Sequence, residues 1–262
     1  MPRGWLKAAL ALTALLASQG PALAGCSRAI LAPMAVSGRL VFADDAERLR
    51  GVWPELLEEV GRLVGCRFTI TPMPRPRMEM EFLAGRSIDL LISATRTPER
   101  DEWGEFVPLF RQPLVIVTRR DAATVPGSLP ALRQSGWRMA VQRNFHFSAE
   151  YRALVAELEA AGRVDAVNGT EAAARMLRAG RVDFALMSPP QAQATAGDEL
   201  MFRRFDGLPL MEVGLYLSRA RLSGADLTLL RDALGRAARD GLVRRVFLRH
   251  YLPEVVNLNQ TL

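Results

Sequence analysis

The stretch LAGRSIDLLISATRTPER, Leu83 to Arg100, decides the fold. A helix is predicted to end at Gly85, because glycine readily adopts the left-handed conformation that closes many helices. The nearly unbroken apolar run after Asp89 is typical of a buried parallel strand, which we expect to end at Ser93. Pro98 then suits the first turn of a further helix. The stretch therefore predicts a helix–strand–helix unit.

A partial repeat of this pattern, LRAGRVDFALMSPP, extends from Leu177 to Pro190. Gly180 takes the place of the helix-ending glycine, and the apolar strand begins at Asp183 and ends at Ser188. The repeat is inexact, because its strand segment is one residue longer than the segment in the first copy. Two copies predict two lobes of similar α/β construction, with ligand sites at the carboxyl ends of their strands.

The order of expected elements assigns the rest of the chain to these lobes. We predict a first lobe from residues 25–118 together with 214–262, and a second lobe from residues 119–213. In the first lobe we expect strands at 29–35, 67–71 and 88–93 and helices at 55–64 and 77–84. In the second lobe we expect strands at 137–141, 164–167 and 182–187 and helices at 148–161 and 170–179. Alternation of helix and strand is typical of α/β proteins.

The first 24 residues differ in character from the rest of the chain. Arg3 and Lys7 precede an apolar run from Ala8 to Ala17, and Ala22-Leu23-Ala24 fits a small-residue cleavage site. This pattern predicts a secretory signal peptide, which is too short for a stable membrane span. No later segment approaches the roughly 18 apolar residues of a transmembrane helix. We therefore expect a soluble mature chain that is exported to the periplasm.

Composition and charge exclude several classes of protein. The chain has 262 residues, of which 34 are Lys or Arg and 28 are Asp or Glu, and its formal net charge is +6. The positive charge is spread along the chain, without the dense basic runs of a nucleic-acid-binding protein. The two histidines, His146 and His250, are far apart and lack clustered carboxylates or paired thiols. We therefore expect neither a metal site nor a cofactor.

Each of the two cysteines, Cys26 and Cys66, precedes a predicted strand. If these strands are parallel neighbours, both cysteines lie at the same end of the sheet. An exported chain meets an oxidising compartment, which favours a disulfide between them. The alternative is a lipid anchor, since Leu23-Ala24-Gly25-Cys26 also matches a bacterial lipobox in which Cys26 would be lipidated.

The segment Thr97-Pro98-Glu99-Arg100 has the residues of a helix start that could bind an anion. Thr97 is a good N-cap, and the exposed amides of a helix start favour negative charge. Arg100 can hold a carboxylate through two hydrogen bonds. The alternative is an ordinary helix cap in which Arg100 pairs with Asp101 or Glu105.

The order of segments along the mature chain resembles family 3 of the extracellular solute-binding proteins, the amino-acid-binding type of bacterial periplasmic receptors. The TPER motif after an apolar strand is the sharpest element of this resemblance. The other segments that carry it are Gly51-Val52-Trp53, the GRSID strand, Phe106–Phe110, Asp240-Gly241-Leu242 and His250-Tyr251. The resemblance implies a two-lobed, type II periplasmic binding protein-like fold, in which each lobe is a mostly parallel sheet flanked by helices.

The same resemblance implies roles for particular residues. In the family the arginine of the TPER motif holds the ligand carboxylate, which points to Arg100 here. An assisting hydroxyl is expected from Thr95, with Ser93 nearby, and Arg75 lies in a loop that overlooks the family's cleft. The implied partners are a small anionic or zwitterionic molecule and the membrane subunits of an ABC transporter, and the implied state is a monomer.

Three features depart from the family pattern. The segment from the strand to the TPER motif is one residue shorter than usual, which shifts Thr95 from its expected spacing. Amino-acid receptors commonly place an aspartate, which binds the ligand ammonium, where this chain has Ser188. The small second-lobe loop is replaced by residues 144–148, so that Phe145 and His146 become candidates for ligand contact.

These observations favour a binding protein that captures a carboxylate-bearing solute, an amino acid or a related organic acid, for an ABC-type transporter. Such a protein needs no catalytic residue. An alternative on the same fold is a dehydratase acting on cyclohexadienyl acids such as prephenate, with His146 or Glu79 as its acid–base group. A third alternative is an orphan receptor with a diverged pocket. The serine at position 188, in place of the usual aspartate, is consistent with this alternative.

Overall fold

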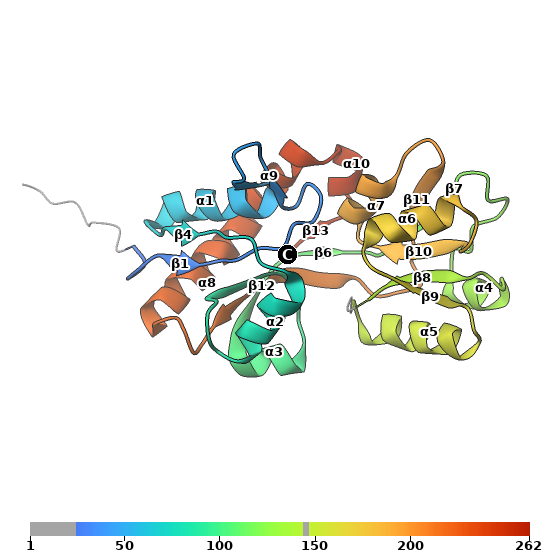
Figure 1. The fold of residues 1–262 in the computed structure, drawn as a ribbon. Coiled ribbons are helices and arrows are strands. Elements are labelled where there is room, and N and C mark those ends of the chain that lie inside the picture. Colours follow the sequence, from blue (N-terminus) through green and yellow to red (C-terminus); the bar gives the residue numbers. More distant parts are fainter. Residues whose placement is uncertain (1–24, 144–146) are drawn as a thin grey trace, which may run out of the picture.

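The computed structural model describes residues 25–143 and 147–262. The predicted signal peptide and the candidates Phe145 and His146 lie outside the described residues. Two separate larger sheets occupy the two halves of the molecule, and helices flank both of them (Figure 1). No helix in the described ranges is long and apolar enough to cross a membrane.

The first half is built on a four-stranded sheet with the order β13-β6-β12-β5, in which all neighbours are antiparallel. Strands β1 and β4 form a separate parallel pair, and β2 and β3 form a short antiparallel pair before α1. The strands are β1 (Ile30–Leu31), β2 (Phe42–Ala43), β3 (Leu49–Arg50), β4 (Phe68–Thr69), β5 (Leu90–Thr95), β6 (Gly104–Gln112), β12 (Met211–Ser218) and β13 (Gln260–Thr261). The helices are α1 (Val52–Val64), α2 (Arg75–Leu83), α3 (Pro98–Trp103), α8 (Gly224–Arg239), α9 (Leu242–His250) and α10 (Pro253–Val256).

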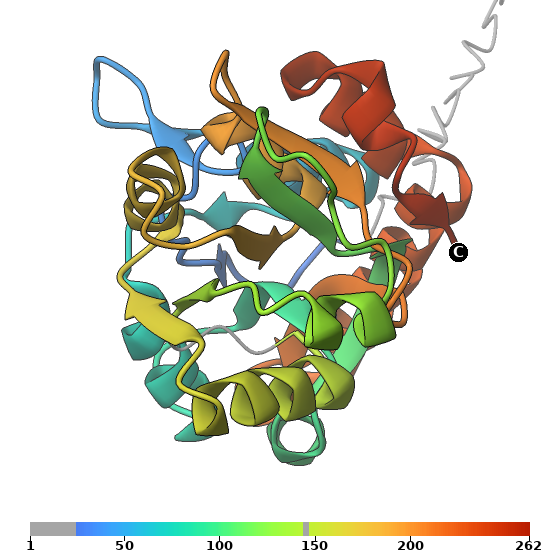
Figure 2. The same ribbon diagram turned by 90° about the vertical axis from the view of Figure 1, so that its right-hand side faces the viewer.

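The second half is built on a five-stranded sheet with the order β11-β7-β10-β8-β9. Strands β8, β9 and β10 run parallel, whereas β7 and β11 are antiparallel to their neighbours. Helices α4 and α5 pack on one face of this sheet and α6 on the other (Figure 2). The elements are β7 (Val115–Arg119), α4 (Leu129–Gln134), β8 (Met139–Gln142), α5 (Ala149–Ala160), β9 (Val164–Val167), α6 (Thr170–Arg178), β10 (Phe184–Met187), α7 (Pro189–Thr195) and β11 (Leu200–Arg204).

The strand directions differ from the expectation of a mostly parallel sheet in each lobe. The four-stranded sheet has no parallel pair, because β12 and β13 return to it from the end of the chain. The five-stranded sheet has two parallel and two antiparallel pairs. Among the described residues, β7 pairs with β10 and β11 of the second half, so we propose lobe boundaries near residues 113 and 208 in place of the predicted 118 and 213.

The repeated motif ends two helices in the same way. The N–H of Gly85 donates to the carbonyl of Phe82 over 2.9 Å, and the N–H of Gly180 donates to the carbonyl of Leu177 over 3.0 Å. Both glycines have positive φ angles, 62° and 64°. Residues with a side chain rarely adopt this conformation, which explains the glycine in each copy.

The aspartates of the repeated motif also have the same contacts in both halves. Asp89 accepts the N–H of Leu31 at Oδ2 over 2.8 Å and donates its own N–H to the carbonyl of Leu31 over 3.0 Å. Asp183 makes the matching pair of contacts with Arg138, over 2.7 and 2.9 Å. Each aspartate thus joins the start of an apolar strand to the neighbouring segment of the sheet.

Cys26 and Cys66 form a disulfide, with their Cα atoms 4.8 Å apart. Ile30 of β1 lies opposite Phe68 of β4 in a parallel pair, so both cysteines lie at the same end of that pair. The predicted disulfide is confirmed.

The two residues after the first cysteine are fixed by carboxylates. Ser27 donates its N–H and its hydroxyl to the two carboxylate oxygens of Asp226 over 2.8 and 2.5 Å. Arg28 donates to both carboxylate oxygens of Asp89 over 2.5 and 2.9 Å, and Arg221 lies 3.3 Å from the same carboxylate. Burial alone would raise the pKa of Asp89, but these hydrogen bonds and charges hold the pKa below its ordinary value.

Replacing both cysteines by alanine should lower the free energy of unfolding. The disulfide closes a loop with a sequence separation of 40 residues, and loop entropy predicts a loss of about 4 kcal/mol or less. Urea unfolding of the two proteins measures the difference. Reductant should destabilise the parent and leave the double variant unchanged, and two titratable thiols in the unreduced, denatured parent would contradict the pairing.

Protonation of Asp89 should contribute to acid unfolding. Because its folded pKa lies below the unfolded value of about 3.9, its stabilisation is complete above that value and is lost as pH falls through the folded pKa. Asp89→Asn should lower the free energy of unfolding at pH 7 by about 1.5–3 kcal/mol, as expected for hydrogen bonds to a charged group. As the pH drops below 4, the free energy of unfolding of this variant should also fall less steeply than that of the parent. Parallel curves for the two proteins would contradict this role.

Candidate functional site

The register of the strands shows which ends of the two sheets face each other. The chain crosses between the sheets directly before β7 and directly before β12. β5 ends at Thr95, which lies opposite Val213 near the start of β12. β10 ends at Met187, which lies opposite Val115 at the start of β7. The carboxyl ends of β5 and β10 therefore both lie beside the crossings, where the two halves meet.

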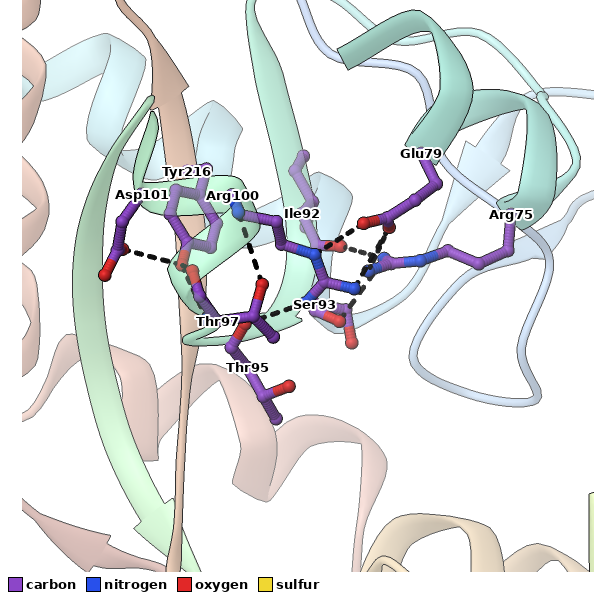
Figure 3. A network of polar contacts seen from close by, with 9 residues as sticks. All are labelled: Arg75, Glu79, Ile92, Ser93, Thr95, Thr97, Arg100, Asp101 and Tyr216. Atoms are coloured by element: carbon purple, nitrogen blue, oxygen red, sulfur yellow. Dashed lines mark hydrogen bonds and ion pairs between the residues drawn. The ribbon is translucent and has the colours of Figure 1, made fainter. Parts of the chain in front are cut away.

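Arg100 lies at the carboxyl end of β5, in the first turn of α3, and is held by three hydrogen bonds (Figure 3). Its Nε and Nη2 donate to the two carboxylate oxygens of Glu79 over 2.6 and 3.1 Å, and its Nη1 donates to the carbonyl of Thr95 over 2.8 Å. Its side chain is only 14% exposed. Among the described residues its ion-pair partner is Glu79, so the alternative pairing with Asp101 or Glu105 is wrong.

Arg75 reaches the same carboxylate from the start of α2. Its Nη1 donates to the carbonyls of Ile92 and Ser93 over 2.7 and 3.3 Å, and its Nη2 lies 3.6 Å from the Glu79 carboxylate. Burial lowers the pKa of Arg75 to about 10, and the positive charge of Arg100 acts in the same direction while Glu79 opposes it. At neutral pH Arg75 therefore remains charged.

Two guanidinium groups thus share one carboxylate in what we call the Arg75–Glu79–Arg100 cluster (Figure 3). With all three groups ionised, the cluster has one positive charge in excess. A guanidinium has five N–H donors, and the contacts described above use three of those on Arg100. The remaining donors and the excess charge suit the two-point binding of a carboxylate.

The two expected hydroxyl residues lie beside this cluster. Ser93 is exposed and has a φ of 54°, and it has no partner in β12 because the register shifts between Gly214 and Leu215. Such bulges and left-handed residues are strained and occur often at functional sites. Thr95 contacts Arg100 through its carbonyl and not through its hydroxyl, which leaves the hydroxyl role a prediction.

Tyr216 holds the start of α3 in place. Its hydroxyl accepts the N–H of Thr97 over 3.0 Å and donates to Oδ1 of Asp101 over 2.9 Å. Thr97 in turn accepts the N–H of Arg100 over 3.3 Å, which confirms the predicted N-cap. Burial raises the pKa of Tyr216 to about 12, helped by Asp101, so the hydroxyl stays protonated at neutral pH.

Ser188 lies at the carboxyl end of β10 and is 7% exposed. Its N–H and its hydroxyl both contact Oε1 of Gln191, over 3.2 and 3.0 Å, so it contributes to the start of α7. A small cavity of about 10 Å³ lies beside it, and its lining has no charged side chain. The lining residues are Ala140, Gln142, Phe147, Thr170, Ala173, Ala185, Leu186, Met187 and Gln191.

The structure therefore gathers Arg75, Ser93, Thr95 and Arg100 at one sheet end and places Ser188 at the facing end of the other sheet. Phe145 and His146 lie outside the described residues. Sequence reasoning missed Glu79 as the partner of both arginines. The four-residue spacing from Arg75 to Glu79 was a usable signal, since such residues face each other on a helix, but the helix was predicted to begin only at residue 77.

Comparison with known proteins decides the family. The model of the bacterial extracellular solute-binding proteins, family 3, matches residues 37–170, just over half of the chain. The chain belongs to this family. The resemblance inferred from the sequence is thereby confirmed, whereas a search of curated protein sequences finds no significant match for the chain.

Solved structures share the fold of this solute-binding protein. The probable amino-acid ABC transporter extracellular-binding protein ytmK from Bacillus subtilis has a TM-score of 0.68 at 18% identity, with 86% of this chain and 98% of that chain covered. An ancestral arginine-binding protein bound to arginine has a TM-score of 0.66 at 19% identity, with 85% and 98% covered. The ancestral amino acid-binding protein AncCDT-1, described as a precursor of cyclohexadienyl dehydratase, has a TM-score of 0.65 at 17% identity, with 86% and 95% covered. The two-lobed α/β fold is confirmed.

Replacing Tyr216 by phenylalanine should destabilise the protein. The change removes the acceptor for the N–H of Thr97 and the donor to Asp101, and an unpaired buried polar group costs about 1–3 kcal/mol. Urea unfolding measures the loss. Tyr151→Phe is the matched control, because the hydroxyl of the buried Tyr151 has no hydrogen-bond partner among the described residues. Equal effects of the two changes would contradict the role of Tyr216.

Proposed function

We propose that this protein captures a small carboxylate-bearing solute, an amino acid or a related organic acid, between its two lobes. The observation that carries the proposal is the excess positive charge of the Arg75–Glu79–Arg100 cluster, which lies at the sheet end that faces the second half. Membership of the solute-binding family supports the same role. Arg100 binds the carboxylate through its remaining donors, and Glu79 keeps its guanidinium in place.

The protein works in the periplasm and delivers the captured solute to the membrane subunits of an ABC-type transporter. The description of the family as extracellular supports this location, and the likeness to a protein named as an ABC transporter extracellular-binding protein supports this partner. Closure of the two lobes around the solute gives the transporter a shape that distinguishes the loaded from the empty receptor. The protein works as a monomer in this scheme.

The proposal includes no catalytic step. Glu79 was one candidate for the acid–base group of a dehydratase, but both of its carboxylate oxygens accept hydrogen bonds from Arg100. A carboxylate held in this way is poorly placed to exchange a proton with a substrate. Formation of product from prephenate would contradict the binding role, and saturable binding without product supports it.

Replacing Arg100 by alanine should weaken ligand binding at least tenfold without unfolding the protein. The loss of one charge-assisted carboxylate contact corresponds to about 1.5–3 kcal/mol. A thermal-shift screen of amino acids and organic acids identifies a ligand, and titration calorimetry then compares the affinities of the parent and the variant.

Arg62→Ala is the matched control for this experiment. Arg62 is exposed in the last turn of α1, away from the cluster, so its removal should leave affinity unchanged. Unchanged affinity in Arg100→Ala would contradict the assignment of the site.

A further inference from the structure

We infer that Gly214 is a positioning residue of the ligand site, because the two bulges that meet at it hold Arg75 in place. This inference rests on the proposed function, since it concerns how one of the two guanidinium groups of the site is fixed. Gly214 lies near the start of β12, the strand by which the chain returns to the four-stranded sheet. Because glycine has no side chain, we expect it to act through the two strands that flank it.

One bulge lies between β12 and β5. Gly214 is paired with Ala94 and the next residue of β12 is paired with Ile92, so Ser93 is an extra residue without a partner in β12. The core contacts show the same shift. Leu91 and Ala94, three residues apart, pack in one core cluster, whereas residues of a regular strand share a face at a spacing of two. The two faces of β5 therefore exchange at Ser93.

A second bulge lies between β12 and β6. Val213 is paired with Phe110 but Gly214 is paired with Pro108, so one residue of β6 is extra here as well. Proline has no N–H to donate, and within sheets it is found at edges, at strand starts and at bulges. Both neighbours of β12 are therefore irregular at the same residue, Gly214.

The close approach of β6 explains why this residue is a glycine. A Cβ atom on residue 214 would overlap the carbonyl oxygen of Val107 and lie 2.9 Å from Cα of Pro108. Both are backbone atoms, which cannot move aside as the end of a flexible side chain can. A side chain at this position would therefore push β6 and β12 apart and disturb the bulges.

The bulge in β5 gives Arg75 its place. Consecutive carbonyl groups of a regular strand point toward opposite neighbours, but Nη1 of Arg75 donates to the carbonyls of both Ile92 and Ser93, over 2.7 and 3.3 Å. Ser93 has a φ of 54°, a conformation that one class of bulge reserves for glycine. Because carbonyl oxygens hold Arg75, Glu79 is left to accept from Arg100 through both carboxylate oxygens.

Calorimetric titration of Gly214→Ala tests the inference. The probes are L-glutamine, L-leucine, L-phenylalanine, glutarate and 3-phenylpropionate, and the compound that binds the parent most tightly is used for every variant. Gly214→Ala should bind this compound about tenfold more weakly, as expected when a charge-assisted hydrogen bond is lost.

Gly61→Ala is the matched control for this experiment. A Cβ atom on Gly61 would overlap the carbonyl oxygen of Cys66, so the crowding against backbone is similar, but Gly61 lies near the end of α1, away from the cluster. The control should lower the free energy of unfolding and leave the affinity unchanged.

A double-mutant cycle separates positioning from a general loss of structure. If Gly214 acts through Arg75, adding Gly214→Ala to Arg75→Ala should lower the affinity by no more than about twofold. An equal loss of affinity in the parent and in the Arg75→Ala background would overturn the inference.

Two variants of Ser93 test the bulge if Gly214→Ala does not fold. Ser93→Gly retains the φ of 54° without strain, whereas Ser93→Val places a β-branched residue where it is a clear outlier. Both variants lack the hydroxyl, so a difference between them reports the backbone. Ser93→Val should bind the probe about tenfold more weakly than Ser93→Gly, and equal affinities would overturn the inference.

Crystal structures of the variants give a readout that needs no bound solute. In Gly214→Ala or Ser93→Val the guanidinium of Arg75 should leave the two carbonyls, and retention of both contacts overturns the inference. Parental affinity in Gly214→Ala, together with loss of binding in Arg100→Ala, overturns the inference alone. If no compound binds the parent, or if binding persists in Arg100→Ala, the proposed function is overturned, and the crystal structures decide whether Gly214 positions Arg75.

Discussion

The arrangement of both halves depends on an aspartate that directly precedes an apolar strand, Asp89 before β5 and Asp183 before β10. Asp89 and Asp183 each use a carboxylate oxygen and a backbone N–H to bind one residue of the neighbouring segment. A side chain that accepts a backbone N–H in this way holds two chain segments beside each other and satisfies a buried donor. Because the strand that follows is apolar and buried, its far end is fixed as well, and the ligand-facing loops begin there.

The candidate site follows from that placement. The strand after Asp89 ends beside the crossings, and α2 and α3 bring Arg75, Glu79 and Arg100 together at its end. A shared carboxylate keeps two like charges close without neutralising both. The guanidinium groups are therefore oriented before a ligand arrives, which reduces the ordering that binding requires.

Much of the fold could be predicted from the sequence, because its signals are local. The helix 55–64 was predicted from apolar spacing and appears as α1, and the strand 164–167 appears with the same bounds as β9. The antiparallel pairing of β6 with β12 could not be predicted, since it depends on segments about one hundred residues apart. The ion pair between Glu79 and Arg100 could not be predicted either, because it depends on how α2 packs against α3.

The route of the chain through the two sheets has a consequence for the order of folding. Every strand of the five-stranded sheet lies between residues 115 and 204, so that sheet can form before β12 and β13 have been synthesised. The four-stranded sheet needs β12 and β13, and its final strand ends at Thr261. The half that contains the arginine cluster can therefore complete its sheet only after β12 and β13 have been synthesised. Until then, the apolar strands β5 and β6 have unpaired edges, and such edges can pair with other chains.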